Sequence, residues 1–305
     1  MRVAAVQAAP VFLDRAATTE KVLRLMREAA QQGAELCVFS ETFLPGYPVW
    51  LMHLVSHLTE AQRQEAYGIY LEAAVDPNGS ELRAIQATAK ELGVFTYLGF
   101  VERAPSGGTV YCSLAAIHPD HGVLSIHRKL KPTYFERLVW GDGDGAGLQV
   151  HEWREFRIGG LNCFENWMPL ARHTLYAQGE HLHVSTWPGR PAHTRDLTRF
   201  IAVEGRLYVV AAAGVLTASD IPSSFPLKSE LTRATQRFWD GGTVIVGPDG
   251  EPIVGPVEKD ETILYADVDV KKVKESRMRF DAAGHYGRPD VFSITVNRER
   301  QDHIR

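Results

Sequence analysis

The amino-acid sequence predicts an α/β protein, and two observations support this prediction. Short runs rich in valine, isoleucine, leucine and aromatic residues, bounded by glycine, proline, aspartate or asparagine, recur along the chain and are typical of buried strands. Between them lie stretches such as residues 81–92, in which apolar residues recur at helical spacing. Alternation of the two is typical of sheets covered by helices.

The expected elements follow from these two patterns. The strands are residues 3–7, 36–40, 94–101, 110–118, 123–127, 156–162, 181–185, 207–213, 242–246 and 263–268. The helices are residues 18–32, 59–74, 80–91, 167–178, 193–205 and 270–276. A single domain over residues 1–305 is expected, because no linker rich in proline, serine or glycine divides the chain. The polar tail, about residues 285–305, is expected to fray or to pack on a neighbouring subunit.

Composition limits the possible partners. Hydrophobic residues make up 45% of the 305 residues and charged residues 23%, as in a globular protein with a substantial core. A formal net charge of −4 gives no electrostatic reason to bind nucleic acid or an anionic membrane. No run approaches the roughly eighteen apolar residues that a membrane span requires. We therefore expect neither nucleic acid nor membrane as a partner.

The cysteines indicate the compartment. Cys37, Cys112 and Cys163 are odd in number, and their spacing suits neither a disulfide framework nor a metal site. Residues 1–7 have the pattern of a first strand rather than of a signal peptide. A reducing, cytoplasmic setting is therefore expected. Cys37 and Cys112 lie within apolar strands and are interpreted as inert core residues.

Cys163 lies where the pattern changes from strand to helix. The small and apolar residues of 156–162 end at this cysteine, and helical periodicity follows it. Unpaired N–H groups and the dipole at a helix N-terminus favour the thiolate over the thiol. The sequence thus predicts a nucleophilic cysteine whose pKa lies below its usual value of about 8.5.

A carboxylate ends another apolar strand. Residues 36–40 stop at Glu41, and the loop 42–48 follows. Burying a carboxylate is costly unless it has a cation or a catalytic task. Two interpretations of Glu41 stay open from this segment alone, a solvated residue at the rim and a functional one.

Basic residues alternate at the end of the strand 123–127. Lys129 and Lys131 can face the same way, because strand side chains alternate with a period of two, and Glu136 follows a little later. Basic residues on a strand usually mark a solvated face or edge. An acyl transfer to cysteine, however, needs a cation near the developing negative charge and a carboxylate to move protons.

Three segments together resemble the carbon–nitrogen hydrolase (nitrilase) superfamily. They are residues 39–48 with Glu41, residues 127–133 with Lys129, and residues 162–166 with Cys163, in the family's order. Residues 131–133, 136–137, 140–143 and 284–290 resemble its true nitrilase branch rather than the amidases. The resemblance extends from residue 1 to about 295. One departure is Phe164, where relatives commonly have tryptophan.

The resemblance implies a role for four side chains. Cys163 matches the family's nucleophile, Glu41 its general base and Lys129 its cationic stabiliser. Glu136 matches a second, structural or proton-handling glutamate. Lys131 competes for the lysine role, but the family's spacings favour Lys129. The implied reaction is hydrolysis of an organic nitrile to the carboxylic acid and ammonia, through a thioimidate and a thioester on the cysteine.

The resemblance also implies a fold and an assembly. The family's fold is a four-layer α-β-β-α sandwich, with two sheets face to face and helices outside. A small-molecule nitrile is the implied substrate. No metal or organic cofactor is expected, because a thiol and an acid–base pair suffice. A homodimer or a larger homo-oligomer, including a spiral, is expected from the assemblies that relatives form.

Aromatic residues near the catalytic segments are candidate substrate contacts. They are Tyr47, Tyr134, Phe164 and Trp187. An aromatic-lined pocket suits an apolar substituent on the substrate. The other interpretation of each is a core or subunit-interface residue.

Two further hypotheses stay open. An amidase, or another C–N hydrolase, would use the same residues on a carbonyl carbon. A catalytically idle interaction protein would keep only the scaffold. The second is disfavoured, because an idle site has no physical reason to bury two carboxylates, a lysine and a thiol together.

Overall fold

Two sheets form the centre of the computed structural model, which describes residues 1–301; residues 302–305 of the expected tail lie outside this part. The first sheet contains, in spatial order, β13 (Thr262–Asp267), β1 (Arg2–Gln7), β2 (Leu36–Val38), β3 (Phe95–Arg103), β4 (Val110–His118) and β5 (Gly122–Arg128). The second contains β10 (Val215–Thr217), β11 (Arg237–Val246), β9 (Tyr208–Ala213), β8 (Leu182–Trp187), β7 (Phe156–Asn162) and β6 (His151–Trp153), with β12 (Pro252–Glu258) also paired to β11. In each sheet the central strands β1–β3 and β7–β9 run parallel.

Helices connect and cover these strands. They are α1 (Arg15–Gln31), α2 (Trp50–His53), α3 (Glu60–Ala73), α4 (Ser80–Leu92), α5 (Pro169–Tyr176), α6 (Pro191–Gly205), α7 (Lys228–Ala234) and α8 (Val270–Arg277). Short 3-10 helices are η1 (Tyr134–Leu138), η2 (Gly145–Gly147), η3 (Cys163–Trp167) and η4 (Ala218–Asp220). Local signals set several ends. The Asp14 side chain accepts from the Ala17 N–H at the start of α1, and Gly93 ends α4 with a φ of 66°.

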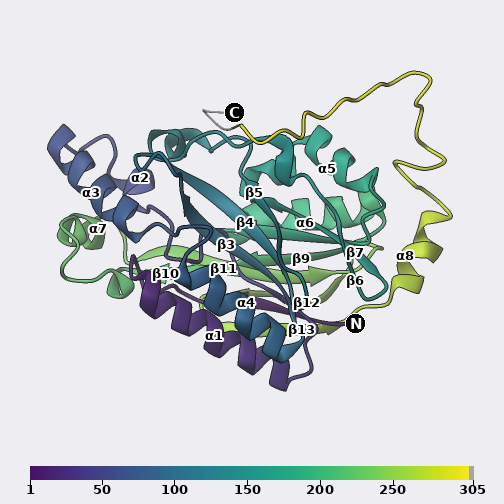
Figure 1. Cartoon of the computed structure of the whole chain (residues 1–305), viewed down its shortest axis with the longest axis horizontal. Coiled ribbons are helices and arrows are strands. Elements are labelled where there is room, and N and C mark those ends of the chain that lie inside the picture. The colour runs from purple at the N-terminus through teal and green to yellow at the C-terminus, as the bar shows by residue number, and fades with distance from the viewer. Residues whose placement is uncertain (302–305) are drawn as a thin grey trace.

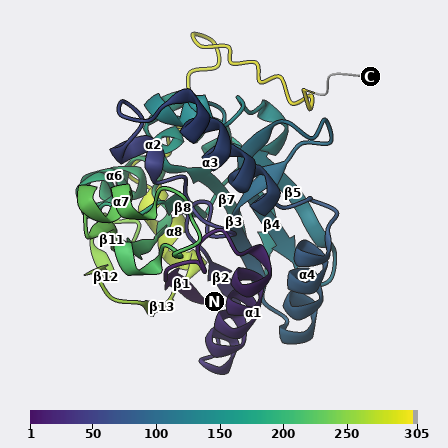
Figure 2. The same ribbon diagram turned by 90° about the vertical axis from the view of Figure 1, so that its left-hand side faces the viewer.

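Alternation along the strands builds the layers. In β1, Val3 and Ala5 belong to the core between the sheets and share it with Val210 of β9. Ala4 and Val6 point the other way, into the core beneath α1 and α4. Figures 1 and 2 show α1 and α4 side by side against this outer face.

The second sheet is covered in the same way. Ile201 of α6 packs with Val209 of β9, and Leu175 of α5 packs with Leu161 of β7. The order of layers is therefore helix, sheet, sheet, helix. The predicted four-layer α-β-β-α sandwich is confirmed.

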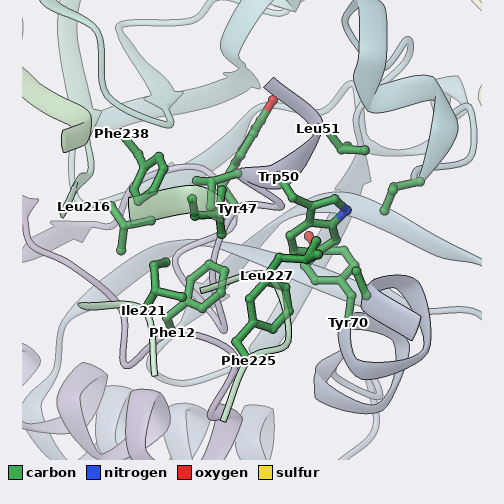
Figure 3. Close-up of a cluster of buried hydrophobic side chains, with 14 of the residues drawn as sticks. Phe12, Tyr47, Trp50, Leu51, Tyr70, Leu216, Ile221, Phe225, Leu227 and Phe238 are labelled. Atoms are coloured by element: carbon green, nitrogen blue, oxygen red, sulfur yellow. The ribbon is translucent and has the colours of Figure 1, made fainter. Parts of the chain in front are cut away.

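A further apolar cluster joins α2, α3 and α7 to one end of the sheets (Figure 3). Tyr47, Trp50 and Tyr70 are buried in it together with Phe225. The rings of Trp50 and Tyr70 meet edge to face, with centroids 5.4 Å apart. Tyr47 belongs to the loop that follows Glu41, so this cluster supports that loop.

The sequence patterns located most elements and missed a few. Residues 110–118 and 156–162 form strands with the predicted bounds. The helix predicted over 167–178 is shorter, because residues 163–167 form a 3-10 helix and α5 begins only at Pro169. β12 has only exposed or half-buried residues and carries a glycine and two prolines, so its sequence lacks an apolar run. Within residues 1–301, no helix has the length and apolar character needed to cross a lipid bilayer.

Candidate active site

Glu41 and Cys163 both come after parallel strands. Glu41 follows β2 of the first sheet shortly, and Cys163 follows β7 of the second directly. The Glu41 N–H donates to the carbonyl of Trp187, at the end of β8, over 3.4 Å, so the two sheets are joined here. A Cβ at Gly99 in β3 would collide with the carbonyl oxygen of Ser40. Glycine therefore lets the Glu41 segment cross that strand closely.

Lys129 and Glu136 come from one continuous segment. Lys129 follows β5, and its backbone N–H donates to the Cys112 carbonyl of β4 over 2.8 Å. Glu136 lies in η1, where its Oε2 accepts from the Thr133 N–H over 2.6 Å. The Tyr47 hydroxyl donates to Oε1 of Glu136 over 2.8 Å. Both oxygens of Glu136 are thus fixed by neighbours.

The four side chains lie together in one buried cluster. The Lys129 ammonium is 2.9 Å from Oε1 of Glu41 and 2.7 Å from Oε2 of Glu136. One donor atom each of Glu41, Glu136 and Cys163 lie within 4.8 Å of one another. All four residues are at most 4% exposed, so their charges interact with little screening by water.

Burial and charge set the protonation of the carboxylate and the amine. Burial raises the pKa of Glu41 to about 7, with Glu136 adding to the rise and Lys129 opposing it. A carboxylate with this pKa can take and return protons at neutral pH. Burial alone would lower the pKa of Lys129, but Cys163, Glu41 and Glu136 outweigh it and hold that pKa well above its usual value. The lysine is therefore a permanent cation.

The predicted low pKa of Cys163 is wrong. Cys163 is not at the N-terminus of an α-helix, because α5 begins only at Pro169. Its own backbone has a φ of 47° at the start of η3. Burial raises the pKa of the thiol well above its usual value, Glu41 adds to the rise, and Lys129 only partly offsets them. The resting group is a neutral thiol that needs a base to become a nucleophile.

Sequence reasoning missed a third buried carboxylate near the cysteine, that of Glu165. Glu165 accepts from the Leu130 N–H at 2.6 Å and from the Asn162 N–H at 2.9 Å. Nε2 of His127 lies 3.0 and 3.1 Å from the two Glu165 oxygens. Burial opposes ionisation, but His127 and the two N–H groups hold the pKa of Glu165 below its usual value. The one available signal was spacing, since His127 lies near the end of β5, two residues before Lys129.

Cys112 was also missed. It was interpreted as an inert core residue, but its thiol donates to Oε1 of Glu41 over 3.4 Å. The same oxygen receives the Lys129 ammonium. Nothing in the strand 110–118, which is buried along its whole length, distinguishes this cysteine. Cys37, in β2, is fully buried, and burial raises its pKa to about 12, in keeping with a core role.

The predicted substrate contacts fall into two groups. Tyr47 and Trp187 are buried, and the hydroxyl of Tyr47 is engaged by Glu136. Tyr134 is 68% exposed and Phe164 is 37% exposed. The rings of Phe164 and Trp187 are 6.4 Å apart, next to the cysteine. Phe164 and Trp187 therefore lie beside the cluster, whereas Tyr134 projects into solvent.

Geometry bears on two alternatives at the site, the competing lysine and a bound metal ion. Lys131, the competitor of Lys129, is half exposed and pairs with Asp142 at 2.6 Å. Within residues 1–301, Glu41, Glu136 and Cys163 form a group whose donor atoms are close enough to hold a metal ion. The Lys129 ammonium already stands against both of these carboxylates, so an added cation would meet a positive charge.

Comparison with known proteins identifies the family. The family model of carbon–nitrogen hydrolases matches residues 2–278. An aliphatic nitrilase of Sinorhizobium fredii is 39% identical over 303 residues, covering 98% of this chain and 96% of that protein. An arylacetonitrilase of Fusarium vanettenii is 36% identical over 330 residues, covering 100% of this chain and 94% of that protein. A CN-hydrolase superfamily protein of Xanthomonas campestris has the same fold, with a TM-score of 0.72, 19% identity, and coverage of 97% of this chain and 99% of that one.

The chain therefore belongs to the carbon–nitrogen hydrolase family. The high coverage by named nitrilases confirms the resemblance to the nitrilase branch and makes the protein an enzyme of that type. The solved structure, at its low identity, confirms the fold alone.

Proposed function

We propose that the protein hydrolyses an organic nitrile to a carboxylic acid and ammonia, with Cys163 as the nucleophile. The observation that supports this most is the buried cluster, in which a thiol, two carboxylates and an ammonium meet around one point. Such a set provides a nucleophile, a base and a fixed positive charge without any further group.

The first step adds the thiol across the nitrile bond. Glu41 takes the proton of Cys163 as the sulfur bonds to the nitrile carbon, and the nitrogen then receives a proton from Glu41. The product is a thioimidate on Cys163. Negative charge grows on the nitrogen during the attack, and the buried Lys129 ammonium is in place to stabilise it. Because the thiol has a raised pKa, proton removal and attack are coupled.

The next steps consume two water molecules. Glu41 activates the first water, which adds to the thioimidate carbon, and protonation of the nitrogen expels ammonia to leave a thioester. The second water attacks the thioester carbon, releases the carboxylic acid and returns the proton to the sulfur. Glu136 keeps Lys129 charged and oriented through its 2.7 Å contact.

Replacing the nucleophile tests this proposal. Cys163→Ala should abolish ammonia release from a panel of aliphatic, arylaliphatic and aromatic nitriles, while Cys37→Ala, a change of the same size in the core, should retain it. Circular dichroism and thermal melting of both variants check the fold. Turnover by Cys163→Ala at the wild-type rate would refute the nucleophile assignment.

The products separate a nitrilase from an amidase. Each nitrile is assayed beside its matching amide, and acid, amide and ammonia are measured. Acid and ammonia from the nitrile support the proposal. Turnover of the amides alone would show that the same cluster acts on a carbonyl carbon instead.

Aromatic contacts are part of the proposal. We propose that Phe164 and Trp187 line the space in front of Cys163, because their rings adjoin each other next to it. Tyr47 contributes through Glu136, with which its hydroxyl is bonded. Tyr134, which is exposed in the single chain, would reach substrate only at the outer end of the site.

We also propose that the protein forms a homodimer or a larger homo-oligomer. Apolar side chains are exposed along η3, α5 and α6 and on the tail. They are Trp167, Met168, Leu170, Phe200, Val203, Tyr286, Val291, Phe292 and Ile294. A groove of about 1120 Å³ runs between α5 and this tail. Large exposed apolar areas of this kind are typical of interaction sites, and a second copy of the chain is the proposed occupant.

Light scattering after size exclusion tests the assembly. The wild-type chain should elute as a dimer or larger species, and Leu170→Glu with Phe200→Glu should shift it towards a monomer, because two charges would be buried in the interface. Glu152→Gln, on an exposed strand position, is the control. A wild-type monomer at every concentration would refute the assembly. The single-domain organisation over residues 1–305, with the tail from about 285 at the interface, is part of the same proposal.

A cytoplasmic location is proposed from the cysteines. All three, Cys37, Cys112 and Cys163, are free thiols. A reducing compartment keeps such thiols from forming disulfides and from being oxidised. Fractionation of the source cells, with assay of nitrile hydrolysis in each fraction, tests this.

A further inference from the structure

An arginine without an acidic partner lies beside the proposed active site. Arg190 follows the end of β8 and stands directly before α6. Its backbone is fixed next to the catalytic loop, because Trp187 accepts from the Glu41 N–H and the Gly189 carbonyl accepts from the Asp240 N–H at 3.0 Å. The position of Arg190 is therefore determined by the same segment that holds Glu41.

Two aromatic rings connect this arginine to the buried carboxylates. The guanidinium carbon of Arg190 lies 5.4 Å from the centre of the Trp239 ring. The Trp239 ring meets Tyr47 edge to face at 5.0 Å, and the Tyr47 hydroxyl is bonded to Glu136. Trp239 also lines a small cavity together with Glu41. Trp239 thus lies between Arg190 and the buried cluster of four side chains around Lys129.

The guanidinium of Arg190 is unpaired among residues 1–301. Arg190 is half-buried, whereas the buried Arg128 and Arg172 have carboxylate partners in Glu102 and Glu204. Arg190 has no ion pair within 4.0 Å, and its side chain contacts the ring of Trp239 instead. Asp240, whose backbone is near, directs its carboxylate to Arg237 at 3.6 Å.

Other polar groups around the arginine also lack partners. Nε1 of Trp239 and Nε2 of His53 are buried, and neither has a hydrogen-bond partner. The ring of His193 lies 5.3 Å from that of Phe164, the residue after Cys163. Burial, and then the positive charge of Arg190, lower the pKa of both histidines, so they stay neutral at pH 7. The surroundings of Arg190 therefore offer a ligand one positive charge and the unpaired indole N–H of Trp239.

We propose that this corner, formed by Arg190, Trp239 and His53, binds a carboxylate of the substrate, so that the preferred nitrile is a cyanocarboxylate. This inference rests on the proposed nitrile hydrolysis. One guanidinium flanked by neutral histidines matches a single negative charge better than the double charge of a phosphate. A guanidinium can bind both oxygens of a carboxylate, and the unpaired indole N–H of Trp239 offers a further donor. The nitrile end of the same molecule then reaches Cys163.

A specificity measurement tests the proposal. The kcat/KM values of the full-length protein are compared for a series of ω-cyanoalkanoates and for nitriles of the same length that end in a methyl group. The wild-type protein should favour the charged member of the best pair. Arg190→Gln should lower the ratio of charged to neutral kcat/KM by about ten- to a hundred-fold, the usual effect of losing a hydrogen bond to a charged group. Arg190→Lys should lower it less, because it keeps the charge and loses only the two-point contact.

The control is an exposed arginine on the same helix. Arg195→Gln changes the net charge of the protein by the same amount, and it should leave the ratio unchanged. An unchanged ratio in Arg190→Gln, or a wild-type preference for the neutral nitriles, would overturn the proposal even if nitriles are hydrolysed well.

A binding measurement separates this inference from the proposed function. Calorimetry with glutarate, a dicarboxylate that resembles the expected product, should show binding that Arg190→Gln weakens about ten-fold or more. Such binding without hydrolysis of any nitrile would mean that the reaction was assigned wrongly while the carboxylate site stands. Hydrolysis of nitriles together with glutarate binding that is independent of Arg190 would refute the site alone.

Discussion

The carboxylate of Glu165 holds the Leu130 N–H at 2.6 Å, although the two residues are 35 positions apart in the chain. Leu130 directly follows Lys129, and Glu165 lies in the turn that begins at Cys163. A second bond joins the same carboxylate to the Asn162 N–H, directly before the cysteine. One side chain thus fixes the nucleophile and its cation relative to each other.

Glu165→Gln should lower kcat about ten- to a hundred-fold with little change in KM. Glutamine has one acceptor oxygen, so one of the two backbone N–H groups loses its partner, and the sulfur and ammonium are no longer held in register. Steady-state kinetics on the best nitrile, with thermal melting in parallel, checks this. Glu152→Gln, at an exposed position, is the control. A KM rise without a kcat loss would instead place Glu165 in substrate binding.

The activity of the free enzyme should rise with pH through about 7. Burial raises the pKa of Glu41 to about 7, and Glu41 can accept the thiol proton only when it is deprotonated. The acid side of the kcat/KM profile should therefore have its midpoint near pH 7, rather than near the pH of about 4.3 that is usual for a glutamate. A pH series on an uncharged nitrile measures it. A flat profile between pH 5 and 8 would contradict the role of Glu41 as base.

Cys112→Ala should move this acid limb to higher pH. The Cys112 thiol donates to Glu41 and lowers the pKa of that carboxyl, so its removal lets the pKa rise. Cys37→Ala removes a sulfur of the same size from the neighbouring core and should leave the limb in place. The measurement is the same pH series on the two variants. An acid limb with the same midpoint pH in both variants would show that the contact with Cys112 has no electrostatic effect on Glu41.

Tyr47→Phe should lower kcat about ten-fold, because Glu136 loses a hydroxyl donor to its charged form and holds Lys129 less firmly. Tyr97→Phe is the matched control: its hydroxyl is also buried, but it donates to the Ile158 carbonyl between the sheets. Rates and melting temperatures of the two variants are compared. A similar loss of activity in both would point to general packing rather than to Glu136.

The architecture could be predicted from the sequence where burial is uniform. β4 and β7 were located with correct bounds, because apolar and small residues dominate each of them and nearly all of their residues are buried. β12 was missed because its residues are largely exposed and its pairing depends on β11, a neighbour that local sequence does not specify.

Residue types at strand ends indicated the candidate site, but the burial of each side chain and its distances to neighbouring groups could not be derived from the sequence. Glu41 and Cys163 were identifiable as polar residues that follow buried runs. The direction in which the pKa of Cys163 is shifted depends on how deeply the thiol is buried and on its distance from Glu41. Both are set by tertiary packing. The contact between Cys112 and Glu41 joins β4 to the loop after β2, and these two strands are not adjacent in the sheet, so spacing along the chain gives no hint of it.

The pairing of Lys129 with two carboxylates has an electrical consequence. One ammonium cannot neutralise both carboxylates, so the buried cluster of four side chains has no net charge only while Glu41 is protonated. That proton has to leave before Glu41 can accept the hydrogen of the Cys163 thiol, so the form that reacts carries one net negative charge. As the sulfur attacks, this charge moves from Glu41 towards the substrate while the Lys129 ammonium stays beside it, so no further charge has to be separated in an interior that screens charges poorly.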